Sequence, residues 1–172
     1  ATAGSIEIAR GFGGLGATPD VAATGVFNRS RADGDAEFIR VSGEAQVSQD
    51  LPGAFQLYAR IGGQWSPDPL LAIEEYQIGA QRFGRAYEPA QLTGDSAAGL
   101  SLELQADLKR IDAFDRVLGA PLSGALVYAF ADVGAAWSEG FSGADTLVSG
   151  GAGVRLELFD HIAADFEAAI PV

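Results

Sequence analysis

Apolar and polar residues alternate along most of the chain. The clearest run is 98–109, where the even positions are Ala or Leu and the odd positions are polar or Gly. Residues 39–48 and 55–62 show the same period of two. Side chains on a β-strand point alternately to opposite faces, so each run predicts a strand with one apolar and one polar side.

Eight such strands are predicted, near residues 5–12, 37–49, 54–65, 74–80, 97–108, 122–137, 146–159 and 162–170. No segment shows the 3.6-residue period of an amphipathic helix, so the chain is predicted to be all-β. The loops of an antiparallel sheet alternate between its two ends. This strand count therefore predicts that the connector 13–36 and the long loop 80–96 lie at opposite ends.

Alternation alone does not say which face meets water, because the apolar face points inward in a sandwich and toward lipid in a membrane barrel. Several predicted strands reach the roughly 9–11 residues that cross a bilayer at a tilt. The opposite faces carry charges that suit a hydrated interior, such as Arg40 with Glu44. Aromatic residues lie at strand ends, as in interfacial girdles: Phe12, Trp65, Trp137 and Phe159. These features favour an antiparallel transmembrane β-barrel segment, with a soluble all-β ligand-binding module as the alternative.

Composition narrows the function classes. The 172 residues include 23 Gly and no Cys, so disulfides, thiolate metal sites and a Cys nucleophile are excluded. A net charge of −12 with a single Lys argues against a nucleic-acid partner. The absence of Met suggests an internal fragment or a processed chain. No apolar stretch approaches the about 18 residues of a transmembrane helix.

Three motifs suggest enzymatic or metal chemistry, and each is better explained otherwise. Residues 11–16 match G-x-G-x-x-G, but no helix pattern follows to hold a pyrophosphate. His161, the only His, lies in a predicted tight turn, and a hydrolase with this base is the third hypothesis. Asp107, Asp112 and Asp115 do not have the spacing of a Ca²⁺ loop. We therefore predict no catalytic residue, no cofactor and no metal site.

Loop 80–96 and the strand near residue 132 carry the candidate site. The loop is long for a hairpin connection and mixes charge with aromatic side chains, including Arg85 and Tyr87. Asp132 stands alone in the apolar run 126–137, where a carboxylate is costly unless a cation or a wet cavity meets it. The pairing suggests a barrel closed by its own loop, and the alternative is an external loop whose arginines offset the negative charge of the protein.

Several motifs together resemble one family, the two-partner secretion transporters of the haemolysin secretion/activation type. The motifs, in order, are Gly63-Gln64-Trp65-Ser66, Pro69-Leu70, Glu75-Tyr76-Gln77-Ile78-Gly79-Ala80, Gly84-Arg85-Ala86-Tyr87, Leu92-Thr93-Gly94-Asp95 and Phe130-Ala131-Asp132-Val133-Gly134. The fourth lies where the family carries a V-R-G-Y/F loop tip, and the last matches its F-x-D-x-G strand motif. Gly84 replaces the usual Val and Ala86 the usual Gly, which restricts the backbone of the tip.

The resemblance implies a bacterial outer-membrane barrel of 16 strands that secretes a large partner exoprotein without catalysis. Residues 1–172 would form a single barrel segment, roughly strands eight to fifteen. The periplasmic domains that bind the client, the first half of the barrel and the final strand would lie outside it.

In the family the long loop folds into the lumen, so the resemblance implies that Arg85 pairs with Asp132 and that Tyr87 packs nearby. Gly94 and Asp95 would support the loop. The expected partners are the secreted client and outer-membrane lipid, and the barrel is expected to be a monomer. A related alternative is a barrel that inserts other outer-membrane proteins.

Overall fold

The computed structural model describes residues 1–14, 30–31, 33–80, 82–111, 122–140, 142–159 and 161–172. In this part of the chain the one helical element is the short 3₁₀ turn η1, Leu108–Arg110. None of the described helical segments has the length and apolar character needed to cross a bilayer.

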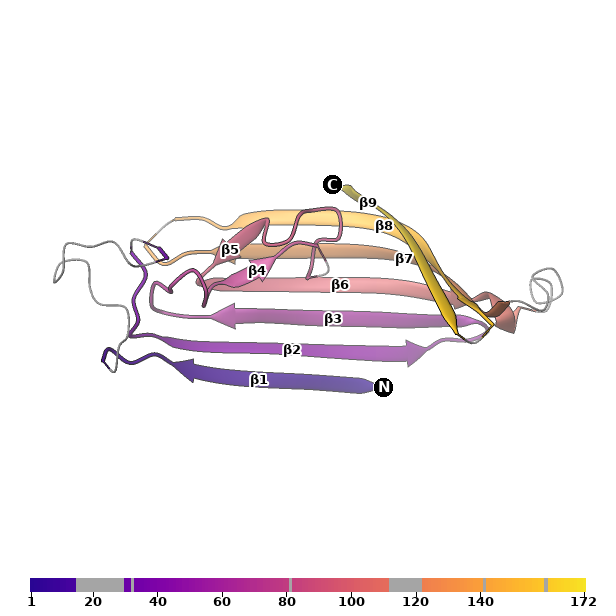
Figure 1. Cartoon of the computed structure of the whole chain (residues 1–172), viewed down its shortest axis with the longest axis horizontal. Coiled ribbons are helices and arrows are strands. Elements are labelled where there is room, and N and C mark those ends of the chain that lie inside the picture. Colours follow the sequence, from indigo (N-terminus) through magenta and orange to yellow (C-terminus); the bar gives the residue numbers. More distant parts are fainter. Residues whose placement is uncertain (15–29, 32, 81, 112–121, 141, 160) are drawn as a thin grey trace.

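Seven long strands form one antiparallel sheet in the order β1-β2-β3-β6-β7-β8-β9 (Figure 1). Their bounds are β1 Thr2–Arg10, β2 Ile39–Asp50, β3 Phe55–Trp65, β6 Ser96–Asp107, β7 Leu122–Trp137, β8 Asp145–Leu158 and β9 Ile162–Pro171. Neighbours in the sheet are mostly neighbours in the chain. The predicted all-β, antiparallel architecture is confirmed, and the sheet in this chain is open, with β1 and β9 at its edges.

The register keeps the two faces of the sheet chemically distinct. Leu100 pairs with Val133, and Val133 pairs with Val148, so apolar rows run across the strands. Each strand contributes to the exposed apolar face: Ile6, Ile8, Val47, Leu57, Ile61, Leu100, Leu102, Leu104, Val133, Val148, Phe166 and Ile170. Charged residues occupy the opposite face, one or more on each strand: Glu7, Glu44, Arg60, Glu103, Asp132, Arg155 and Glu167. The sheet thus has one apolar and one charged face, a division that is also typical of the wall of a membrane barrel.

The prediction of a barrel strand at residues 74–80 was wrong. Only Tyr76–Ile78 (β4) is extended there, and it pairs with Leu92–Gly94 (β5) in a separate two-stranded sheet. The main sheet therefore passes from β3 directly to β6. With one strand fewer, the connector before β2 and the loop between β3 and β6 lie at the same end of the sheet, not at opposite ends (Figure 1).

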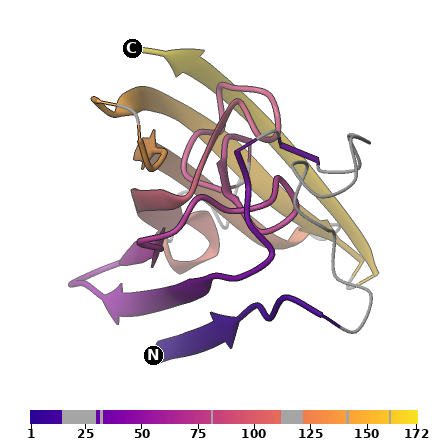
Figure 2. The same ribbon diagram turned by 90° about the vertical axis from the view of Figure 1, so that its left-hand side faces the viewer.

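The segment between β3 and β6 folds back over the polar face of the sheet. Viewed along the strands, the curved sheet wraps around this segment (Figure 2). The buried core lies between the two: Tyr76, Ile78 and Phe83 of the loop with Ala97, Ala136 and Leu147 of the wall. This packed cluster thus lies inside the curve of the sheet, where it holds the loop against the wall.

Candidate functional site

Arg85 extends from the loop to Asp132 on β7, at the centre of the polar face. The Arg85 Nε donates to Asp132 Oδ2 at 3.1 Å, and Nη2 donates to Oδ1 at 3.1 Å. The Arg85 backbone N–H also donates to Oδ2 at 3.1 Å. The pair is therefore bidentate, and the backbone of the loop tip is fixed by the same carboxylate. The expected contact between these two residues is present.

Other groups surround the Arg85 guanidinium. Its Nη1 donates to Glu103 Oε2 at 2.7 Å, its Nη2 donates to Ser101 Oγ at 3.2 Å, and its Cζ lies 3.5 Å from the Phe130 ring centroid. Burial works to lower the pKa of Arg85, but the hydrogen bonds to Asp132 and Glu103 outweigh it and raise the pKa above the ordinary arginine value. Arg85 is therefore cationic at every pH that the protein meets.

The Asp132 carboxylate is almost fully buried, with a side chain only 1% exposed. In addition to Arg85, it accepts hydrogen bonds from Ser101 Oγ at 2.7 Å and Ser149 Oγ at 3.3 Å. Both of its oxygens are thus occupied by donors from the loop and from two neighbouring strands. This accounts for a carboxylate inside an otherwise apolar run.

The network continues across the wall through Glu103, which the sequence analysis did not single out. Glu103 Oε1 accepts from Arg155 Nη1 at 2.8 Å, and Arg155 Nε donates to Asp165 at 3.2 Å. Tyr128 lies beneath Arg155, with its ring centroid 4.0 Å from the guanidinium carbon. The four strands β6 to β9 are therefore joined by polar contacts on this face. The signal in the sequence was the position of Glu103 and Arg155 on the polar sides of β6 and β8, the two strands that flank β7.

The other residues of the predicted loop tip and wall motif also lie at this contact. Tyr87 donates its hydroxyl to the Val148 carbonyl at 3.1 Å, on β8. Gly84 is buried against Leu147, where an added Cβ would come within 2.7 Å of a Leu147 methyl. Ala86 does not have a positive φ, so replacing the usual Gly strains nothing at this position. Gly134 lies under β4, and an added Cβ would be 2.5 Å from Ile78.

Asp95, predicted as loop support, is a second buried carboxylate at the loop end of the sheet. It is fully buried and accepts from Arg31 Nη1 at 2.6 Å, from the Leu70 N–H at 2.7 Å and from the Glu139 N–H at 2.8 Å. Gly94 precedes it, and an added Cβ there would be 2.7 Å from the Trp137 carbonyl. Asp95 therefore joins three segments that are distant in the sequence.

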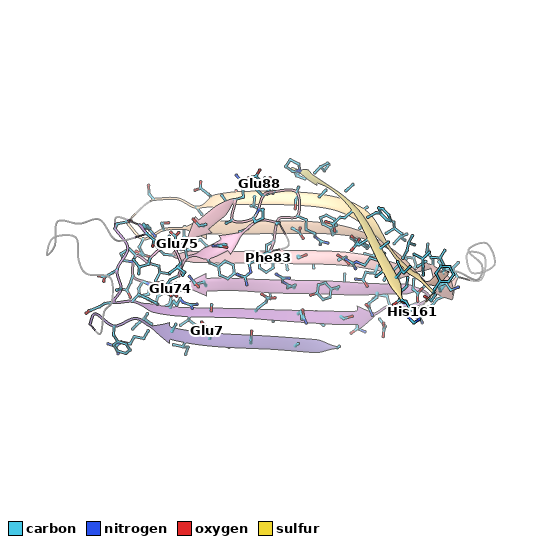
Figure 3. The ribbon with its side chains drawn as sticks, viewed as in Figure 1. Glu7, Glu74, Glu75, Phe83, Glu88 and His161 are labelled. Carbon is cyan, nitrogen blue, oxygen red and sulfur yellow. The ribbon has the colours of Figure 1, made fainter. Side chains whose placement is uncertain are left out.

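Arg31 was missed by the sequence analysis because nothing in the pattern of the connector marks it. It also donates to Glu75 at 2.9 Å and to Asp33 at 2.8 Å. Burial works to lower the pKa of Arg31, but hydrogen bonds to Asp33 and Asp95 outweigh it and raise the pKa above the usual value. Glu75 and Glu74 are seen at this end of the molecule in Figure 3.

The residues once considered for catalysis or metal binding do not form a site with these groups. His161 lies exposed in the turn between β8 and β9, at the end of the sheet away from Glu75 (Figure 3). Asp107 accepts from the Lys109 N–H at the start of η1, while Asp112 and Asp115 lie outside the described residues. Within the described residues, no three His, Cys, Asp or Glu side chains are grouped as metal ligands. The arrangement of Arg85, Asp132 and Glu103 can hold the loop against the wall.

A family model described as haemolysin secretion/activation protein ShlB/FhaC/HecB matches residues 2–156, which include both the loop tip and the strand motif. The chain belongs to this family. The resemblance inferred from the sequence motifs is thereby confirmed, and membership places the chain in a family of two-partner secretion transporters of the outer-membrane β-barrel type.

A solved structure of CdiB from Escherichia coli has the same fold as this member of the haemolysin secretion/activation family. The TM-score is 0.74 at 21% sequence identity, and the match covers 99% of this chain. The chain spans 30% of the length of that structure. No curated protein matches the sequence.

Proposed function

We propose that the protein containing this chain is a bacterial outer-membrane pore that secretes a large partner exoprotein and performs no catalysis. Family membership supports the transport class. The face chemistry supports the location, because an apolar outer face meets lipid and a charged inner face lines a hydrated passage. The chain itself would be one segment of a monomeric barrel wall, with client-binding periplasmic domains elsewhere in the protein.

One observation carries the mechanism: Arg85, on the loop between β3 and β6, is bound to Asp132 on the inner wall. The loop therefore lies on the face along which a secreted polypeptide would pass. In this proposal the seated loop narrows the passage, and each round of secretion starts from this state, shifts the loop from the wall and returns it. Arg85 and Asp132 hold the starting state, so a variant that cannot seat the loop does not secrete.

The burial of the pair decides the size of its effect. An ion pair in a fully hydrated passage would contribute no more than about 1 kcal/mol. The side chains of Arg85 and Asp132 are only 15% and 1% exposed, so the pair is closer to the buried limit. Removing one partner of a buried pair costs about 3–5 kcal/mol, mainly through the charge left behind.

The test is secretion of the neighbouring exoprotein by the full-length parent, comparing the unmodified protein with Arg85→Asp and with Arg85→Asp/Asp132→Arg. We expect loss of secretion in the single variant and partial recovery in the exchanged pair, with equal amounts of folded barrel in the membrane. Arg10→Asp is the matched control, because Arg10 is exposed near the end of β1.

Each outcome bears on a different part of the proposal. Normal secretion by Arg85→Asp would show that the loop–wall pair has no role in secretion, while the proposal of a secretion pore would still stand. If the unmodified parent secretes no exoprotein, the transport proposal fails and insertion of other outer-membrane proteins becomes the better hypothesis. If the parent stays monomeric in buffer without detergent, the membrane location is wrong.

A further inference from the structure

Phe83 lies in a wall socket made of three glycines on neighbouring strands. Gly62 on β3 pairs with Gly99 on β6, and Gly99 pairs with Gly134 on β7, so the three form one row across the polar face. Phe83 is 1% exposed and belongs to the buried cluster between the loop and the wall. Figure 3 shows Phe83 over the middle strands of the sheet, inside the loop segment.

The socket exists because these wall positions have no side chains. A Cβ added at Gly99 would come within 2.3 Å of the Phe83 ring, a distance that only displacement of the ring can relieve. A Cβ at Gly62 would be 3.0 Å from the ring, and one at Gly134 would be 3.1 Å from the Phe83 carbonyl.

The backbone conformation of Phe83 is unfavourable for a bulky residue, so placing the ring in the socket costs free energy. Its φ is 58°, in the left-handed region that a bulky residue rarely adopts. The Arg60 guanidinium lies 4.9 Å from the ring centroid and covers the socket from β3. Burial of the ring and its contact with the cation are what offset the unfavourable backbone conformation.

We propose that Phe83 is a second positioning residue of the loop, which holds it on the wall through apolar packing in the socket formed by Gly62, Gly99 and Gly134, apart from the ion pair of Arg85. The inference rests on the proposed function only in taking the seated loop as the closed state of the passage. Phe83 and Arg85 are two residues apart, so apolar packing and an ion pair hold the same loop tip. Loss of either one shifts the loop toward the released state.

Loop position can be measured without any client. Ser149 is 1% exposed in this structure and donates to Asp132, the carboxylate that holds the loop, so we expect it to become accessible when the loop leaves the wall. Ser149→Cys changes one atom, and this chain contains no Cys of its own. In full-length protein without other cysteines, the rate at which a membrane-impermeant thiol reagent labels residue 149 reports how often the loop leaves the wall.

Five variants are compared on the Ser149→Cys background: Phe83→Ala, Phe83→Leu, Gly99→Ala, Phe83→Ala/Gly99→Ala and the control Gly150→Ala. The control has room for a methyl group, since the atom nearest to its added Cβ is the Phe130 carbonyl oxygen at 3.6 Å. We expect both single variants to label faster by about tenfold or more, as removal or displacement of a buried ring releases the loop. The two effects should not add in the double variant, because the ring is absent and only the Cβ of residue 83, at 2.7 Å, remains close to the added methyl. Phe83→Leu should restore much of the protection.

Unchanged labelling in Phe83→Ala would overturn the inference even if secretion behaves as proposed. Additive effects of Phe83→Ala and Gly99→Ala would overturn the socket, since they would place the two residues in separate contacts. Folding of the barrel is checked for every variant by comparing the gel migration of unheated and heated samples. If Gly99→Ala does not assemble, the inference is tested by Phe83→Ala and Phe83→Leu. Equal labelling of these two variants would then overturn it.

Discussion

Arg31 and Asp95 are 64 residues apart in the sequence, and their side chains form an ion pair of 2.6 Å. Asp95 also accepts the backbone N–H groups of Leu70 and Glu139. The pair thus joins the connector before β2, the start of the loop that crosses the polar face, and the segment after β7. These three connections meet at one end of the sheet, above the wall to which Arg85 binds.

Asp95→Ala is expected to lower the free energy of unfolding by about 2–5 kcal/mol, because two buried N–H groups lose their acceptor. Arg31→Ala should cost less, since Asp95 would keep both backbone donors. Urea unfolding of the full-length protein in detergent measures both. Asp33→Asn is the control on the same arginine: the Asp33 side chain is 47% exposed, and its pair should contribute less than about 1 kcal/mol. A larger effect of Arg31→Ala than of Asp95→Ala would contradict this ordering.

Arg85→Lys preserves the positive charge and removes the planar guanidinium group, which donates to Asp132 and to Glu103 at the same time. A Lys ammonium cannot donate to both carboxylates in the same planar geometry. We expect secretion to fall by roughly tenfold, less than in Arg85→Asp. Arg10→Lys, at an exposed site, should secrete normally. Secretion equal to that of the unmodified protein would mean that charge alone is sufficient.

Tyr87→Phe deletes the hydroxyl that binds the Val148 carbonyl and keeps the ring. Loss of one such hydrogen bond is worth about 0.5–1.5 kcal/mol. Labelling of Ser149→Cys should therefore rise by about three- to tenfold. Tyr58→Phe is the matched control, because the Tyr58 hydroxyl binds Gln46 and not the loop. An equal response in the two variants would show that the Tyr87 hydroxyl does not position the loop.

Leu102→Arg tests which face of the sheet meets lipid. Leu102 is 42% exposed on the apolar face, in the middle of β6. An Arg on the lipid face near the bilayer centre costs about 2–4 kcal/mol. We expect less folded barrel in the outer membrane fraction, whereas Gln46→Arg, on the polar face of β2, should assemble normally. If Gln46→Arg reduced assembly and Leu102→Arg did not, the face that carries Gln46 would be the one that meets lipid.

Most of the fold could be predicted because alternation directly reports a half-buried strand. The same rule produced the error at residues 74–80. Tyr76 and Ile78 are buried and Gln77 is exposed, so the alternation there is real. A local pattern does not name the pairing partner of a strand, and here the partner is β5 in a small sheet on the loop.

The candidate site could be predicted in part. Asp132 was conspicuous because a carboxylate in an apolar run requires a partner. Glu103 was not conspicuous, since a polar residue on the polar side of a strand is ordinary. The glycine row was invisible because Gly62, Gly99 and Gly134 come together only through the register of three strands. Sequence alternation assigns residues to faces, but it does not align one strand with the next.

The loop that carries Phe83 and Arg85 is attached at both ends to strands that are hydrogen-bonded neighbours, since Gln64 near the end of β3 pairs with Ala97 near the start of β6. A released tip therefore remains within a short distance of its own wall. Its return is a unimolecular step with a high effective concentration, and it needs no second protein. Reclosure would be as fast after a thousand passages as after the first, independent of how much protein the membrane contains.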